Sequence, residues 1–303
     1  MEPVNKILIC LQDPDETAGL LSHATLLAAI DGDAELHLLH VRSPEPAAPG
    51  PGAPPSPLGP DELRAWAEAA GPDIDRYRWR AEVLEGSRLV EILRYAMDNE
   101  IDLILLGQAG PADTERPRRG TLARRITAKA TCSVLLVPRG AASGGRRIIV
   151  PVRNSPCSAM ALATACRIAE LAGGAVCALN VFAVHSNYLK VGATLEEHTA
   201  LMRQWAEREC EELLRSVADS KVQVTTRCEP DLYLDPVPII LSHVRHSEAD
   251  LVVIGARGRT GAAGVLLGTV TEQLMQDCPV PVLAVKKKGE CLGVLRALLS
   301  LAG

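Results

Sequence analysis

The chain has few aromatic residues and no excess of positive charge. Aromatic residues make up 3% of its 303 residues and include a single phenylalanine, so side chains on which bases or sugars could stack are scarce. Lys and Arg number 32 against 37 Asp and Glu, which gives a formal net charge of -5. A nucleic-acid-binding protein carries the opposite, basic imbalance. We therefore expect no nucleic-acid partner.

The sequence also lacks long apolar runs and paired cysteines. Its apolar runs, such as residues 178–184, stop well short of the roughly 20 residues that a membrane-spanning helix needs. The first residues do not show the basic and then apolar pattern of an export signal. Nine cysteines occur without a Cys-x-x-Cys pair, and several lie in apolar runs, which favours reduced, buried thiols. These absences predict a cytoplasmic protein with no membrane partner.

An internal repeat divides the chain into two similar halves. Residues 102–107 (Asp-Leu-Ile-Leu-Leu-Gly) correspond to residues 250–255 (Asp-Leu-Val-Val-Ile-Gly), 148 positions later. The apolar runs 6–11 and 147–152 also correspond, but 141 positions apart. The first half therefore carries extra residues, and the chain contains two copies of one unit.

The extra residues and the linker set the expected domain boundaries. Residues 44–60 hold eight prolines in seventeen positions, a composition that favours extended, solvated chain over a sheet. A run rich in Gly, Ala and Ser at 139–145 suits a linker. We predict a first domain at 1–140 with a proline-rich insertion at 44–60, a second domain at 146–288, and a C-terminal tail helix at 289–303, where leucines recur at helical spacing.

Each half alternates apolar runs typical of buried strands with segments of helical periodicity. The expected strands are 6–11, 35–41, 77–83, 103–106 and 133–137 in the first half, and 147–152, 175–182, 221–228, 251–254 and 280–285 in the second. Apolar strands that alternate with helices indicate a parallel sheet covered on both faces. The predicted fold class is α/β, with two tandem, doubly wound, five-stranded parallel sheets and a ligand site where the strand order reverses.

A glycine-spaced loop follows the fourth strand of each half. The second-half loop has Gly255, Gly258, Gly268 and Thr269, and the first-half loop has Gly107, Gly110, Gly120 and Thr121. Such glycines let backbone N–H groups approach an anion, and the following helix start offers unpaired N–H groups. Arg257 and Arg259 add positive charge to the second loop. The pattern predicts a phosphate site, with the alternative that the glycines only make tight turns.

On these motifs the chain resembles a tandem universal stress protein. Both loops fit Gly-x2-Gly-x9-Gly-(Ser/Thr), the signature of the family's nucleotide-binding branch, and residues 250–261 and 278–285 are similar to the family's fourth and fifth strands. The resemblance covers both halves almost end to end. It implies a flavodoxin-like (adenine nucleotide alpha hydrolase-like) sheet of order 3-2-1-4-5 and ATP as ligand, with or without Mg²⁺. It also implies that fifth strands pair, as an intramolecular pseudo-dimer here or in a homodimer.

The resemblance further implies that ATP lies between the first-strand end, the second-strand end and the glycine loop. In the second domain these positions are Pro151, Val152, Arg153, Val181, Gly255, Arg257, Gly258, Arg259, Gly268, Thr269 and Val270. In the first domain they are Gln12, Asp13, Val41, Gly107, Gly110, Gly120 and Thr121. We expect no catalytic residue and no metal site of the protein's own.

Two departures from the family pattern distinguish the halves. Many ATP-binding members carry Asp just after the first strand, where this chain has Gln12 and then Asp13 in the first domain and Arg153 in the second. Arg153 cannot accept a hydrogen bond, so it either contacts phosphate or fills the nucleoside pocket and abolishes binding. The first loop carries Asp113 and Glu115, partly offset by three arginines. We therefore favour the second domain as the ATP site.

Three function classes follow from these observations. The favoured one is a cytoplasmic ATP-binding regulator or sensor of the stress response with little or no turnover. A weak ATPase or self-phosphorylating protein is an alternative, although no Walker lysine and no general base stand near the loops. The other alternative is a nucleotide-free interaction scaffold, which requires a protein partner that the sequence does not name.

Overall fold

The computed structural model describes residues 4–30, 32–42, 59–71, 74–108, 121–185, 194–256 and 267–289. These residues form two compact units, which we call the first and second domain. The first holds residues 4–143, 267 and 286–289, and the second holds residues 144–256 and 268–285. Most of the proline-rich insertion and all but the first residue of the expected tail helix lie outside the described residues.

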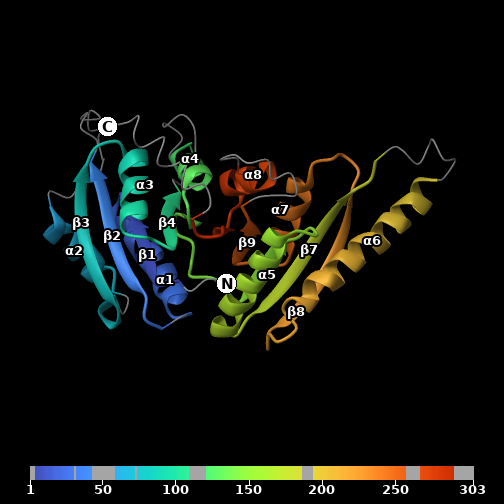
Figure 1. The fold of residues 1–303 in the computed structure, drawn as a ribbon, viewed down its shortest axis with the longest axis horizontal. Helices are drawn as coiled ribbons and strands as arrows, with labels where there is room; N and C mark the ends of the chain where they lie inside the picture. Colours follow the sequence, from blue (N-terminus) through green and yellow to red (C-terminus); the bar gives the residue numbers. More distant parts are fainter. Residues whose placement is uncertain are drawn as a thin grey trace. The chain divides into compact units, whose positions relative to one another are not determined.

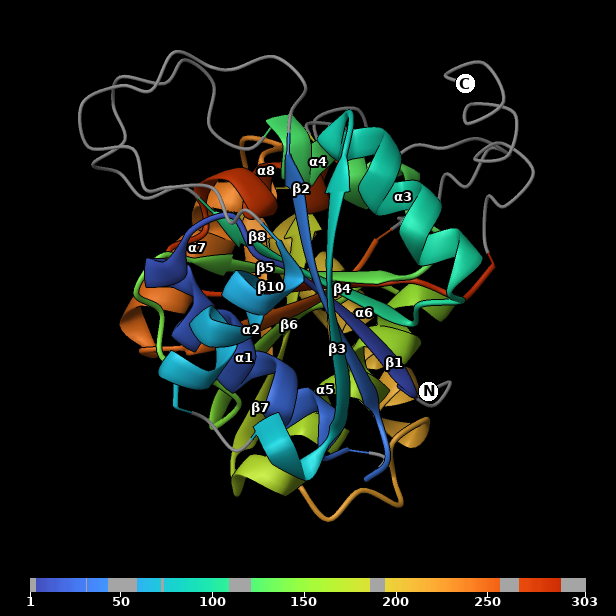
Figure 2. The same cartoon turned by 90° about the vertical axis from the view of Figure 1, so that its left-hand side faces the viewer.

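The first domain alternates strands and helices. Its strands are β1 (Lys6–Cys10), β2 (Glu35–Arg42), β3 (Arg78–Glu85), β4 (Leu103–Gln108) and β5 (Ser133–Pro138). Its helices are α1 (Pro14–Ala28), α2 (Pro60–Ala69), α3 (Arg88–Asp98) and α4 (Thr121–Lys129), with a short 3-10 helix at Ile74–Arg76. The strands are all parallel, in the order β3-β2-β1-β4-β5. Figure 2 shows α1 and α2 on one face of this sheet and α3 on the other.

The second domain repeats this arrangement. Its strands are β6 (Arg147–Pro151), β7 (Ala175–Ala183), β8 (Gln223–Asp231), β9 (Leu251–Gly255) and β10 (Val282–Val285). Its helices are α5 (Pro156–Ala172), α6 (Leu195–Arg215), α7 (Pro236–His246) and α8 (Thr269–Asp277). The strands are parallel in the order β8-β7-β6-β9-β10, and the labelled elements can be followed in Figure 1. The predicted fold class, two tandem doubly wound parallel sheets, is confirmed.

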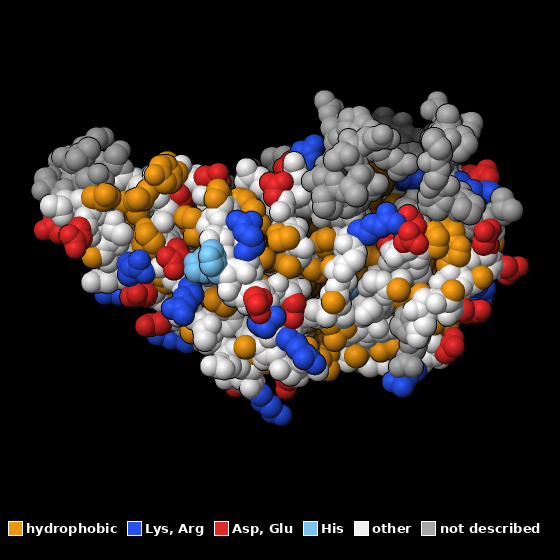
Figure 3. All heavy atoms as spheres, turned by 180° about the vertical axis from the view of Figure 1, so that it is seen from behind, with side chains coloured by type: hydrophobic (Ala, Val, Ile, Leu, Met, Phe, Trp, Pro, Cys, Tyr) orange, Lys and Arg blue, Asp and Glu red, His pale blue; other side chains and the backbone are white. Residues whose placement is uncertain are grey.

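The central strands are buried because helices cover both faces of each sheet. Ile7, Leu8 and Ile9 of β1 have no solvent exposure. The edge strand β8, in contrast, exposes much of its length. On the face of the molecule that Figure 3 displays, basic and acidic side chains are interspersed, in keeping with their similar numbers in the sequence. Among the described residues, no helix is both long and apolar enough to cross a bilayer.

One aspartate anchors the start of the sheet in each domain. Asp102 accepts hydrogen bonds from the backbone N–H groups of Asn5 and Lys6, both at 2.9 Å. Asp250 accepts the corresponding bonds from residues 145–147 at 2.9–3.1 Å. The aspartate of the repeated Asp-Leu motif is therefore a structural residue at the amino edge of the strands, opposite the edge where a ligand is expected.

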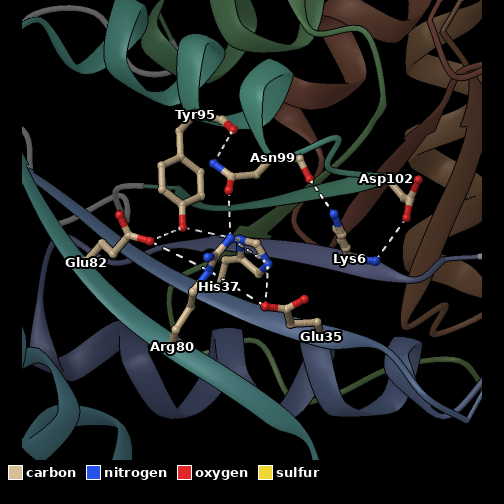
Figure 4. Close-up of polar contacts among 8 residues, drawn as sticks. All are labelled: Lys6, Glu35, His37, Arg80, Glu82, Tyr95, Asn99 and Asp102. Atoms are coloured by element: carbon tan, nitrogen blue, oxygen red, sulfur yellow. Dashed lines mark hydrogen bonds and ion pairs between the residues drawn. The ribbon is translucent and has the colours of Figure 1, made fainter.

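A polar cluster at the same edge of the first domain surrounds His37 of β2 (Figure 4). The His37 side chain is 0% exposed, and its Nε2 lies 3.3 Å from Glu35 Oε1. Its Nδ1 lies 3.1 Å from Arg80 Nη2 and 3.2 Å from the Tyr95 hydroxyl. Arg80 also donates to Asn99 Oδ1 at 2.7 Å. The ring is thus held between a carboxylate on one nitrogen and a guanidinium on the other.

This arrangement favours a neutral His37. A neutral ring with its hydrogen on Nε2 donates to Glu35 and accepts from Arg80 at Nδ1. Protonation would add a hydrogen on Nδ1, which faces the Arg80 guanidinium and has only the Tyr95 oxygen as an acceptor. Burial, and after it the Arg80 charge, lower the pKa of His37 to about 4. The cluster therefore belongs to the stability of the first domain rather than to a ligand site.

Candidate functional site

A recess opens at the carboxyl edge of the second-domain sheet. It is lined by Pro151, Val152, Arg153, Ser155, Ser158, Leu179, Val181, Pro236, Ile240, Ile254, Gly255, Val270 and Thr271. It contains about 550 Å³ of space unfilled by protein atoms, part of which is open solvent. The lining comes from the carboxyl ends of β6, β7 and β9, where the strand order reverses around β6, and from the helices α5, α7 and α8. Ligands of doubly wound sheets bind at this place.

The inner walls of the recess are apolar. Val152, Leu179 and Val181 come from the strand ends and are almost completely buried. Ile254 and Ile240 extend the same surface from β9 and α7. Such walls can pack against a flat, weakly polar ring.

The hydroxyl groups of the recess hold its walls in place. Ser155 caps α5, where its Oγ accepts from Ser158 N at 3.2 Å and donates to Ser158 Oγ at 3.1 Å. Ser158 Oγ in turn accepts from Arg153 N at 3.0 Å. Thr271 Oγ1 donates to Gly255 O at 3.1 Å. These bonds connect α5 and α8 to the strand ends and fix the shape of the recess.

Arg153 is the charged side chain among the described residues that line the recess, and it is exposed. Its Nη2 lies 3.4 Å from Val181 O, across the ends of β6 and β7. No carboxylate lines the described part of the recess. The recess therefore has a positive local charge, which suits an anionic ligand.

The amino end of α8 borders the recess without a side-chain cap. Gly268 is its N-cap residue, with φ -64° and ψ 139°, and supplies no side-chain hydrogen bond. Val270 and Thr271, in the first turn, line the recess. By contrast, Ser155 caps α5 and Asp235 caps α7. An uncapped helix start presents free N–H groups and the positive end of the helix dipole, which favour a phosphate.

The recess brings together six of the second-domain residues expected from the sequence: Pro151, Val152, Arg153, Val181, Gly255 and Val270. Gly268 and Thr269 stand at the start of α8 beside it. Arg257, Gly258 and Arg259 lie outside the described residues. Sequence reasoning did not include Leu179, Pro236, Ile240, Ile254 and Thr271. The Asp-Pro start of α7 was a usable signal, because a helix that follows a strand of this sheet begins at the carboxyl edge.

The glycine at or next to the end of the fourth strand of each domain lies close to the helix that packs on that strand. A Cβ atom at Gly255 would lie 2.7 Å from Cys157 Cβ and 2.9 Å from Cys157 backbone atoms, because the first turn of α5 packs closely on β9. A Cβ atom at Gly107 would meet the Glu16 carboxylate of α1. Packing of α5 therefore requires a glycine at position 255 whether or not a ligand binds, whereas at Gly107 only the flexible end of the Glu16 side chain would have to move.

The corresponding edge of the first domain is acidic. Asp13 caps α1, where its Oδ1 accepts from Asp15 N at 2.9 Å, and its Oδ2 lies 3.5 Å from Arg139 Nη2. Glu16 places its carboxylate against Gly107. These carboxylates would repel a phosphate at this edge. The difference in charge between the two domains therefore favours the second domain for an anionic ligand.

The remaining first-domain candidates are only partly described. The side-chain amide of Gln12 is buried and has no hydrogen-bond partner. Val41, at the end of β2, is fully buried. Thr121 begins α4, and Gly110 and Gly120 lie outside the described residues. Among the residues that the structure describes, no group of three or more His, Cys, Asp or Glu side chains is placed to hold a metal ion.

Comparisons with known proteins agree with the fold. A universal stress protein of Methanocaldococcus jannaschii, MJ0531, is 30% identical over 144 residues, which are 47% of this chain and 82% of that protein. The solved structure of the functionally unknown protein PA1789 of Pseudomonas aeruginosa is 18% identical, covers 98% of each chain and has a TM-score of 0.69. The solved structure of a universal stress protein of Archaeoglobus fulgidus is 18% identical, covers 93% of this chain and 98% of its own, and has a TM-score of 0.61.

The sequence profile of the Universal stress protein family matches the chain twice. The matches cover residues 3–138 and residues 145–286. Each match spans one complete set of five strands. The chain therefore belongs to the universal stress protein family, with one family domain in each half.

Proposed function

We propose that this protein is a cytoplasmic ATP-binding regulator of the stress response that holds ATP in the recess of its second domain, with little or no turnover. The observation that carries the proposal is an apolar recess at the carboxyl edge of the sheet, with Arg153 on one wall and the uncapped start of α8 beside it. An adenine ring needs apolar walls, and a triphosphate needs positive charge and free N–H donors.

The residues divide between the two ends of such a ligand. Leu179, Val181 and Ile240 supply apolar surface for the base. The first turn of α8 supplies backbone N–H groups for phosphate, and Arg257 and Arg259 of the loop motif add charge. ATP would bring Mg²⁺ on its own phosphates, because no carboxylate lines the described part of the recess.

The composition of the recess also supports slow turnover or none. Its described lining holds no carboxylate and no histidine, so it offers no side chain suited to accept a proton from an attacking water. The role that we propose is therefore to bind and report ATP. Pairing of the two domains, and of whole chains, remains a prediction from family resemblance.

Calorimetric titration of MgATP into the full chain tests the proposal. We expect micromolar binding at one site, lost in Val270→Trp, because Val270 is partly exposed in the recess wall and a larger ring fills the space. Gln273→Trp, on the exposed side of the same helix, is the matched control and should bind as the original protein does. Cyclic AMP is titrated in parallel. Weaker binding of cyclic AMP than of ATP would indicate selection for the triphosphate, and equal binding would indicate a site for any adenine nucleotide.

The same measurement separates the alternatives. A flat titration, together with no nucleotide released when the purified protein is denatured, supports the interaction scaffold. Binding followed by phosphate release that Thr269→Ala abolishes supports the weak ATPase. Binding without phosphate release agrees with the proposed regulator.

A further inference from the structure

Two buried cysteines of the second domain touch each other. Cys210 lies on α6 and Cys228 on the edge strand β8, and their Sγ atoms are 3.9 Å apart. Cys210 is 2% exposed and Cys228 is 7% exposed. Figure 1 shows α6 running along β8, and the two elements pack together. The two thiols therefore lie at the contact between α6 and β8.

Neighbouring polar groups hold the pair in place. Asn180 of β7 hydrogen-bonds Cys210 through its side chain, and its Nδ2 lies 3.4 Å from Glu209 Oε2. Arg203 of α6 donates to the backbone oxygen of Cys228 at 2.5 Å. These bonds tie α6 to β7 and β8 around the two sulfur atoms, which no covalent bond joins.

Both thiols are protonated at neutral pH. Burial, and after it the neighbouring Cys228, raise the pKa of Cys210 to about 12. Burial also raises the pKa of Cys228. Because the thiolate is the reactive form, both groups react slowly, and the pair stays reduced until an oxidant is present in excess.

We propose that Cys210 and Cys228 are a modification site, at which a hydroperoxide converts the dithiol into an intramolecular disulfide. A disulfide requires the sulfur atoms to approach to about 2.05 Å, which is about 1.9 Å closer than the observed 3.9 Å. Side-chain rotation on α6 and β8 can supply this movement without separating the helix from the sheet. The inference does not depend on nucleotide binding.

The oxidation proceeds in two balanced steps. One thiol loses its proton and attacks a peroxide oxygen, so that an S–O bond forms, the O–O bond breaks, and an alcohol or water leaves. The second thiol then attacks the sulfenic sulfur, so that the S–S bond forms, the S–O bond breaks, and water leaves. Overall, the dithiol loses two electrons and two protons, and the hydroperoxide is reduced. A dithiol reductant reverses the change.

Peptide mapping of the oxidised full chain tests this inference. The protein is treated with tert-butyl hydroperoxide and then denatured in the presence of N-ethylmaleimide, which blocks the remaining free thiols. It is then digested. We expect a mass loss of two hydrogen atoms, a linked peptide that joins Cys210 to Cys228, and full recovery with dithiothreitol. Cys177→Ser should still form the link, whereas Cys228→Ser should not.

Cys157 and Cys177 are only partly buried, so they should be oxidised at lower hydroperoxide concentrations than the buried pair. If Cys210 and Cys228 are recovered as N-ethylmaleimide adducts after treatment with excess hydroperoxide, the inference is wrong. Sulfinic acid on either buried cysteine, or links between chains, would overturn it as well. All of these outcomes are measured on the protein without substitutions, so the test does not depend on whether a variant folds.

Discussion

The guanidinium of Arg153, at the end of β6, lies with Nη2 3.4 Å from the backbone oxygen of Val181, at the end of β7. The contact is long for a hydrogen bond, and the side chain is exposed. Arg153 can therefore leave this carbonyl when an anion enters the recess. In this position Arg153 could serve the proposed nucleotide site by contacting phosphate, although it cannot accept a hydrogen bond.

Arg153→Ala should weaken ATP binding. Loss of one charged donor to phosphate is expected to lower the affinity about tenfold, or about 1.4 kcal/mol. The difference in ATP affinity between the variant and the original protein should decrease as salt is added, because salt screens an exposed charge. Calorimetric titration at two salt concentrations measures both effects. Tighter binding by the variant would mean that Arg153 occupies the nucleoside position and blocks the site.

Thr269→Pro should weaken binding of ATP but not of adenosine. Proline fits the first position of a helix, and Gly268 already has the extended backbone, ψ 139°, that precedes proline. The change removes one N–H donor and one hydroxyl while α8 keeps its start. Thr269→Val, which removes only the hydroxyl, is the control. Equal ATP affinities for the original protein and the proline variant would contradict phosphate binding at α8.

Gly255→Ala should destabilise the second domain more than Gly107→Ala destabilises the first. The new Cβ at Gly255 meets backbone atoms of Cys157 at 2.9 Å, whereas at Gly107 it meets the flexible end of Glu16. Overpacking of this kind costs about 1–3 kcal/mol, and a side chain can move aside where backbone cannot. Chemical denaturation of the two variants measures the difference. Similar losses, or a larger loss at Gly107, would contradict the close packing of α5 on β9.

Stability of the first domain should fall between pH 7 and pH 5 because of His37. Its pKa is about 4 in the folded protein, below the value of about 6.5 in an unfolded chain. As pH falls through 6.5, the unfolded chain binds a proton that the folded domain does not, so the free energy of unfolding decreases. Urea midpoints across this range measure the slope, and His37→Gln should flatten it. An unchanged slope in the variant would exclude His37 as its source.

The fold could be predicted because the repeat and the strand pattern are local properties of the sequence. The apolar runs that became β1 and β6 are continuous, as buried parallel strands require. The Asp235-Pro236 pair is a local signal of the same kind, because Asp235 accepts from the N–H of Val237 at 3.3 Å and proline fits the first turn of α7.

The site was harder to predict because its walls come from contacts between distant segments. Ile240 and Ile254 face one recess only because α7 packs on β7 and β8 and against α8, and no local pattern reports those contacts. The close approach of Glu16 to Gly107 has the same origin. At Gly255 the neighbour is the backbone of Cys157, so a glycine spaced for phosphate binding can also be required by helix packing.

Hydrogen exchange of the full chain with and without MgATP tests the central claim most directly, because it reports both domains at once. We predict slower exchange with ATP in peptides that cover residues 151–158, 179–182 and 255–271, and no change in peptides that cover residues 11–17 and 39–42. Protection confined to the first-domain peptides, or no protection anywhere at saturating ATP, would contradict an ATP site in the second domain.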